Sequence, residues 1–103
     1  MSLQDEVTAA IYRAIDDVNL QLPPAGRLEK TRDTVLFGRE AGLDSLGMVN
    51  LLVALEQQLE QGLRRPVSLS IAEMMLEPEG AFMRVHSLRD YVVSRLQVLA
   101  SRE

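Results

Sequence analysis

The chain has 103 residues, 47% of them hydrophobic and only 4% aromatic, which suits a single domain over residues 1–103 with an aliphatic, helical core. Its net charge of −4 and the lack of a basic stripe argue against a nucleic-acid surface. The absence of cysteine excludes a disulfide, and the single histidine, His86, cannot form a zinc site of the usual spacing. No apolar run approaches the roughly 18 residues that span a membrane, and no signal peptide is recognisable, so we expect no membrane insertion and a cytoplasmic location.

The first predicted helix covers about residues 3–20. Negative charge at Asp5 and Glu6 suits its first turn, and Pro23 and Pro24 cannot continue it. Its apolar residues recur at spacings of four and three, which places them on one face: Val7, Ile11, Ile15 and Val18.

The segment from 21 to 43 has no clean periodicity and predicts a long first loop. A loop of this length in a compact domain needs apolar anchors. We expect Leu36 and Phe37 to plug one end of the helical bundle. A short additional helix over residues 28–32 is an alternative for the middle of the loop.

The second predicted helix begins at Ser45 and runs to about Gln61. Asp44 is a suitable N-cap, and Gly62 is a suitable stop. A broad apolar arc predicts that this helix contacts several neighbours at once: Leu46, Val49, Leu52, Val53, Leu55 and Leu59.

Two further helices are predicted after it. Residues 70–73 match a capping box that opens a short third helix through Leu76, and Ser87 is the predicted cap of the last helix. The expected inward face of the last helix consists of Leu88, Tyr91, Val92, Leu96 and Leu99. The fold class is therefore all-α, a four-helix bundle with a long first loop and a short third helix.

Ser45 is the candidate functional residue. It lies in the first turn of the second helix, where free backbone N–H groups and the positive end of the helix dipole favour a phosphate attached to its hydroxyl. An Asp-Ser pair at a helix start more often has only a capping role, and that alternative stays open.

Residues 36–59 resemble the acyl carrier proteins, which are phosphopantetheine-binding carrier domains. The resemblance is specific over this window and extends over nearly the whole chain as a helix pattern. Its motifs are Leu36-Phe37-Gly38, Gly42-Leu43-Asp44-Ser45-Leu46, and the helix positions Val49, Leu51-Leu52 and Val53-Ala54-Leu55-Glu56. The resemblance implies an acyl-carrier-like four-helix bundle, acting as a stand-alone monomer.

The resemblance further implies a 4'-phosphopantetheine arm joined to Ser45 by a phosphodiester. A phosphopantetheinyl transferase (holo-carrier synthase) would install it from coenzyme A. The arm's thiol would then carry acyl groups as thioesters between acyl-activating and acyl-transfer enzymes, and the carrier itself would catalyse nothing. Asp44 and Leu46 would flank the cofactor, and three residues of the same helix would contact partners: Met48, Val49 and Glu56. Because the chain has no cysteine, the arm would supply its only thiol.

Gly47 and Asn50 depart from the family pattern. Many carriers of fatty acid biosynthesis are acidic at these positions, so charge steering toward partners should be weaker here. This favours a specialised lipid, polysaccharide-modification or secondary-metabolite pathway over housekeeping lipid metabolism. The nature of the cargo stays open, and an aminoacyl or peptidyl carrier is one alternative. A second is an unmodified helical adaptor that uses the apolar arc as a partner groove.

Four residues between the second and last helices pose a separate question. Methionine is flexible, so this cluster suits either a pocket for a variable acyl chain or, more commonly, gap-filling in a core. The four residues are Met74, Met75, Phe82 and Met83.

Overall fold

The computed structural model describes residues 2–37, 42–64, 66–67 and 84–100, except for the side chains of Ser45, Leu99 and Ala100. These residues form three α-helices and one turn of 3₁₀ helix, with no β-strand among them, which confirms the all-α class at this level. The elements are α1 (Leu3–Asn19), η1 (Pro24–Gly26), α2 (Ser45–Leu63) and α4 (Val85–Ala100). The predicted third helix, and the cluster formed by Met74, Met75, Phe82 and Met83, lie outside the described residues.

Helix α1 forms much as its sequence predicts. The Ser2 hydroxyl oxygen accepts a hydrogen bond from the N–H of Asp5 at 3.1 Å and thereby caps the helix. The helix ends at Asn19, and the N–H of Leu20 still donates to the carbonyl of Asp16 at 3.3 Å. All four predicted apolar positions of its inner face are buried, and Ala10 and Ala14 extend that face.

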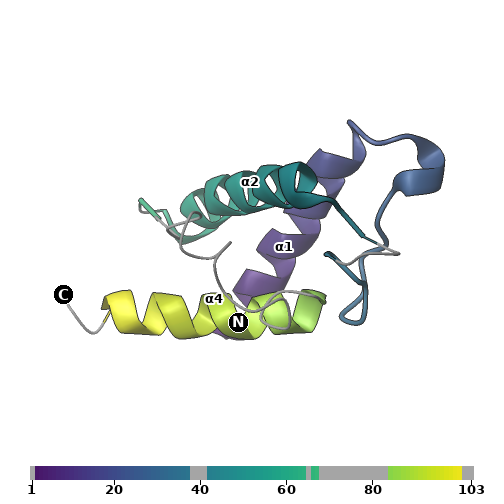
Figure 1. Cartoon of the computed structure of the whole chain (residues 1–103). Helices are drawn as coiled ribbons and strands as arrows, with labels where there is room; N and C mark the ends of the chain where they lie inside the picture. Colours follow the sequence, from purple (N-terminus) through teal and green to yellow (C-terminus); the bar gives the residue numbers. More distant parts are fainter. Residues whose placement is uncertain (1, 38–41, 65, 68–83, 101–103) are drawn as a thin grey trace.

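The core lies where α1 meets α2 and α4. Helix α1 packs against both of the other helices, and it crosses from the level of α4 to the level of α2 (Figure 1). Burial of large aliphatic side chains stabilises this arrangement, at roughly 1.5–3 kcal/mol for each one. The largest fully buried side chains are Ile11, Ile15, Leu36, Met48, Leu51, Leu52, Leu55, Leu59 and Leu88.

The loop between α1 and α2 is anchored at both of its expected positions. Leu36 is completely buried, and Phe37 is partly buried against the core, as predicted. The alternative helix over residues 28–32 is not present. The side chain of Asn19 instead binds both backbone groups of Leu28, accepting from its N–H at 2.8 Å and donating to its carbonyl at 2.9 Å. These bonds hold the backbone in a non-helical path.

The start of α4 corrects the predicted cap at Ser87. The helix begins at Val85, so Ser87 lies inside its first turn. The loop supplies acceptors for the first N–H groups of the helix: the N–H of Val85 donates to the carbonyl of Thr34 at 3.1 Å, and the N–H of His86 to that of Arg32 at 3.0 Å. These bonds satisfy donors that would otherwise need a side-chain cap. The predicted inner positions Leu88, Val92 and Leu96 are buried, Tyr91 is partly buried, and Leu99 lies outside the described side chains.

Helix α2 starts at Ser45 as predicted, but it ends later than predicted and buries a different set of residues. It continues through Gly62 to Leu63, and the chain leaves it at Arg64, whose φ of 56° is left-handed. Part of the predicted apolar arc is exposed, with 71% of Leu46 and 41% of Val53 accessible to solvent. The buried face is formed by Met48, Leu51, Leu52, Leu55 and Leu59. This face lies roughly opposite Leu46 and Val53, at 100° per residue around the helix.

Candidate functional site

The candidate site is the start of α2, where Asp44 holds the helix in place. The Oδ1 atom of Asp44 accepts a hydrogen bond from the N–H of Gly47 at 2.8 Å, and the carbonyl of Asp44 accepts one from the N–H of Met48 at 2.8 Å. The backbone of Asp44 is extended, as N-cap residues usually are. Its carboxylate also lies at the positive end of the helix dipole, so its negative charge is favoured there.

The backbone before Asp44 is fixed against the loop. The N–H of Leu43 donates to the carbonyl of Leu36 at 2.7 Å, and the Leu43 side chain is buried. Gly42 has a φ of +89°, and a Cβ on it would lie 2.8 Å from the carbonyl carbon and oxygen of Leu36. Only glycine permits this conformation together with this close approach. The backbone that leads into the site is therefore joined to the core through Leu36 and Leu43.

The surface beside Ser45 is open, and beyond the Asp44 carboxylate the first turn of α2 carries no charge. Asp44 is exposed, 71% of Leu46 is accessible, and the first turn of α2 has no acidic residue. No acceptor in the part of the chain that the structure describes takes the backbone N–H of Leu46. A backbone donor at a helix start that has no acceptor among the described residues can bind an anionic group.

Gly47 leaves room for the cap. A Cβ at this position would lie 3.1 Å from the Cβ of Leu43 and 3.2 Å from the Oδ1 of Asp44. A side chain would therefore crowd both the buried Leu43 and the capping carboxylate. The neutral residue at this position has a local structural reason, independent of any partner.

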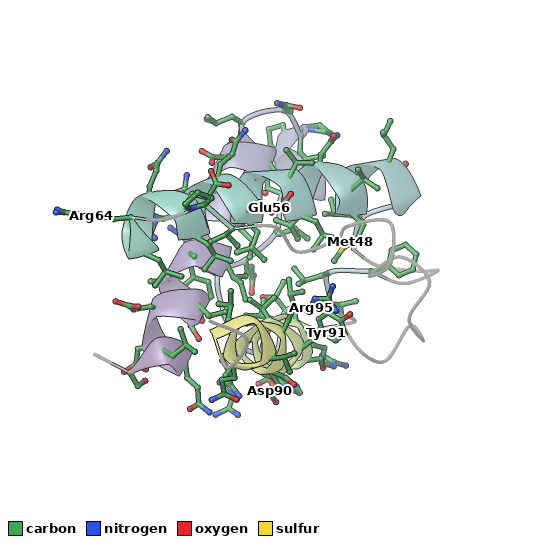
Figure 2. All side chains as sticks on the ribbon, turned by 90° about the vertical axis from the view of Figure 1, so that its left-hand side faces the viewer. Met48, Glu56, Arg64, Asp90, Tyr91 and Arg95 are labelled. Atoms are coloured by element: carbon green, nitrogen blue, oxygen red, sulfur yellow. The ribbon has the colours of Figure 1, made fainter. Side chains whose placement is uncertain are left out.

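The structure places the other predicted site residues in different environments. Asp44 and Leu46 lie together at the start of α2, and Val49 and Glu56 are partly buried further along the helix. Met48 requires a correction, because its side chain is completely buried and has no surface with which to contact a partner. It projects from the side of α2 that faces α4, whereas Arg64 points away from the helices (Figure 2).

A groove beside α2 was missed by the sequence reasoning. It lies between the end of α1 and the middle of α2 and has a volume of about 460 Å³. Val18, Val53 and Ala54 contribute apolar surface, and the polar lining consists of Asp17, Gln21, Asn50 and Gln57. The spacing of Leu46, Asn50, Val53 and Gln57 is that of one helical face and could have indicated a common surface.

One wall of this groove is braced by side-chain hydrogen bonds between α1 and α2. The Nε2 of Gln58 donates to the Oδ2 of Asp17 at 3.0 Å, and the Nε of Arg13 donates to the Oε1 of Gln58 at 2.9 Å. The carboxylate of Asp17 is thus engaged by an amide of the neighbouring helix. The groove therefore has a fixed wall on the α1 side.

In comparisons with known proteins, no family model, no curated protein and no solved structure matches the chain. Among the described residues, no group of three or more histidine, cysteine, aspartate or glutamate side chains is arranged to hold a metal ion. Within the same residues, no helix is both long and apolar enough to cross a membrane.

Replacement of Asp44 by alanine should lower the free energy of unfolding by about 0.5–2 kcal/mol, because the N–H of Gly47 loses its acceptor. For a domain of this size, each kcal/mol corresponds to about 4–8 °C in melting temperature. Thermal unfolding followed by circular dichroism measures the effect. Asp44→Asn is the matched control, since its amide oxygen can still cap the helix. Equal melting temperatures for the two variants would contradict the capping role.

Proposed function

We propose that the protein is an acyl carrier protein whose Ser45 bears a 4'-phosphopantetheine arm, on which acyl groups are carried as thioesters. The observation that supports this most directly is the start of α2 at Ser45, immediately after the Asp44 cap and beside the N–H of Leu46, which has no acceptor among the described residues. A phosphodiester attached at this position would lie next to that donor and the positive end of the helix dipole.

The surroundings of Ser45 fit such a group. The neighbours Asp44 and Leu46 are exposed, so a transferase has access to the helix start. The segment from Gly42 to Asp44 is anchored through Leu36 and Leu43, so the backbone that leads into the helix is held against the core. When bound, the arm supplies a thiol for thioester chemistry, and the chain has no cysteine to compete with it.

In this proposal residues 70–76 form the short third helix of a four-helix bundle, and the protein acts as a cytoplasmic monomer that catalyses no reaction itself. Its partners are a phosphopantetheinyl transferase and the acyl-activating and acyl-transfer enzymes of one pathway. The uncharged Asn50, one turn beyond Leu46, favours a specialised lipid, polysaccharide-modification or secondary-metabolite pathway, whereas Gly47 has its own structural reason.

The decisive experiment is modification of the purified chain by a broad-specificity phosphopantetheinyl transferase with coenzyme A and magnesium. Intact-mass spectrometry should show a gain of one phosphopantetheine, and Ser45→Ala should abolish it completely. The cap of α2 is Asp44, not Ser45, so the Ser45→Ala variant keeps the capping bond. Circular dichroism should confirm that it remains folded.

Ser94→Ala is the matched control, because Ser94 is an exposed serine on α4. This variant should be modified like the wild type. If a known carrier in the same tube gains the arm and this chain does not, the carrier function is wrong. The exposed Leu46 and Val53 would then favour the second candidate, an unmodified helical adaptor.

A further inference from the structure

A cavity lies between the first half of α1 and the end of α2. It has a volume of about 150 Å³ and is more enclosed than the groove between Val18 and Val53. Gly62, which lines it, comes 17 positions after Ser45, and this spacing corresponds to about 25 Å along the axis of α2. The cavity is therefore separate from the candidate site and remote from it.

The wall of the cavity is mainly apolar. Two of its residues, Ala10 and Leu59, are buried, and two more, Ala9 and Leu63, are partly buried. Apolar cavities of about 150 Å³ take up molecules of the size of benzene. The cavity therefore has room for a compact apolar group of about six carbon atoms.

Arg13 supplies a positive charge at the edge of the cavity. Its Nε donates to the Oε1 of Gln58 at 2.9 Å, and its Nη2 lies over Gly62, 3.4 Å from where a Cβ would stand. Asp17, one turn further along α1, binds the Nε2 of Gln58 instead. Among the described residues, no carboxylate forms an ion pair with Arg13. A fixed guanidinium group beside an apolar cavity is suited to pair with the carboxylate of a ligand.

Glu6 is the other charged residue that lines the cavity. It precedes Arg13 by seven positions, which corresponds to about 10 Å along α1. This separation exceeds the screening length of about 8 Å at physiological ionic strength, so Glu6 repels a carboxylate beside Arg13 only weakly. The same negative charge favours a ligand whose acidic group lies at Arg13 rather than deeper in the cavity.

We propose that this cavity binds a small carboxylic acid with a compact apolar body of about six carbon atoms, whose carboxylate pairs with Arg13. The site is additional to Ser45 and needs no phosphopantetheine arm. A cavity with an apolar wall and one oriented charged group is the usual design of a small-molecule site. For a ligand of about nine non-hydrogen atoms, the expected Kd is on the order of 1 mM.

The test titrates the unmodified protein with three ligands that share one ring and differ in charge: benzoate, benzyl alcohol and benzylamine. Two-dimensional amide NMR follows the binding. Benzoate should shift the amide signals of Ala9, Ala10 and Gly62, and it should bind about five-fold more tightly than benzyl alcohol, as expected for one exposed ion pair. Benzylamine should bind most weakly, because its charge has the same sign as that of Arg13.

Two substitutions separate the charge from the cavity. Arg13→Gln should weaken benzoate binding about five-fold and change benzyl alcohol binding by less than about two-fold. Arg27→Gln, the matched control, removes the same charge from an exposed loop position outside the cavity and should change neither. Ala9→Leu fills the cavity and should weaken all three ligands by more than about ten-fold, whereas Ala25→Leu on the exposed loop should not.

Circular dichroism should show that all four variants remain folded. Equal affinities for the three ligands, tightest binding of benzylamine, or no shift at the cavity residues would each overturn the site. Shifts confined to Leu46 and Gly47 would also overturn it, because they would place the carboxylate at the start of α2. Modification of Ser45 is measured separately by mass, so failure of this site and failure of the carrier function are distinguishable.

Discussion

Replacement of Leu36 by alanine is expected to lower the free energy of unfolding by about 2–5 kcal/mol. The Leu36 side chain is completely buried although it comes from a loop. Its truncation would leave a cavity beneath the candidate site, and the remaining core can close this cavity only in part. Domains of this size are stable by about 5–15 kcal/mol, so the loss is a large share of the total.

Leu20 provides the matched control for Leu36. It undergoes the same chemical change to alanine but is 81% exposed, so its replacement should alter stability by no more than about 0.5 kcal/mol. Urea denaturation of the three proteins measures both effects. A loss at Leu36 as small as that at Leu20 would mean that the loop does not anchor the start of α2.

Gly42→Ala is expected to destabilise the protein by about 2–4 kcal/mol, for two reasons that act together. A φ of +89° is unfavourable for alanine, at about 1–2 kcal/mol, and the new Cβ would lie 2.8 Å from the carbonyl carbon and oxygen of Leu36. These are backbone atoms and cannot rotate away. The segment carrying Asp44 and Ser45 must therefore shift, and modification of Ser45 should slow as well.

Gly26→Ala is the control for this substitution. A Cβ at Gly26 would meet only the ring of Pro23, at 3.6 and 3.8 Å, which is ordinary van der Waals contact. Its stability should stay the same or rise slightly, because alanine restricts the unfolded chain. Urea denaturation gives both values. Equal effects of the two substitutions would contradict the close approach of Gly42 to Leu36.

Local sequence signals were sufficient for α1 and for the start of α2. The Ser2 cap, the apolar spacing and the two prolines all lie within or next to α1. Asp44 caps α2 by accepting a hydrogen bond from the N–H of Gly47, only three positions later. Such signals are contained in a short window, so a sequence reader can find them. They located the backbone of the candidate site correctly.

The predictions were wrong where residues distant in the sequence determine the local structure. The cap of α4 comes from backbone carbonyls of Thr34 and Arg32, and carbonyls carry no sequence signature. The path at Leu28 depends on the side chain of Asn19, which lies in a different element.

Local sequence signals also did not predict which side of α2 is buried. An apolar arc as broad as that of α2 does not show on which side the neighbouring helices pack. Leu46 was consequently assigned to the arc and Met48 to the surface, whereas the structure exposes the first and buries the second. The groove is lined by residues of both α1 and α2, so the sequence of neither helix alone could locate it.

The contact between the loop and α4 also affects the order of events during synthesis. The Nη1 of Arg84 donates a hydrogen bond to the backbone carbonyl of Asp33 at 2.6 Å, across 51 positions of sequence, next to the bonds accepted by the carbonyls of Thr34 and Arg32. When α2 has left the ribosome, those carbonyls still bind water, because their partners have not been translated. At about 5–20 residues per second, the nascent chain waits about a second or more before α4 arrives. The hydrogen bonds between residues 32–34 of the loop and the start of α4 are thus among the last to form in the molecule.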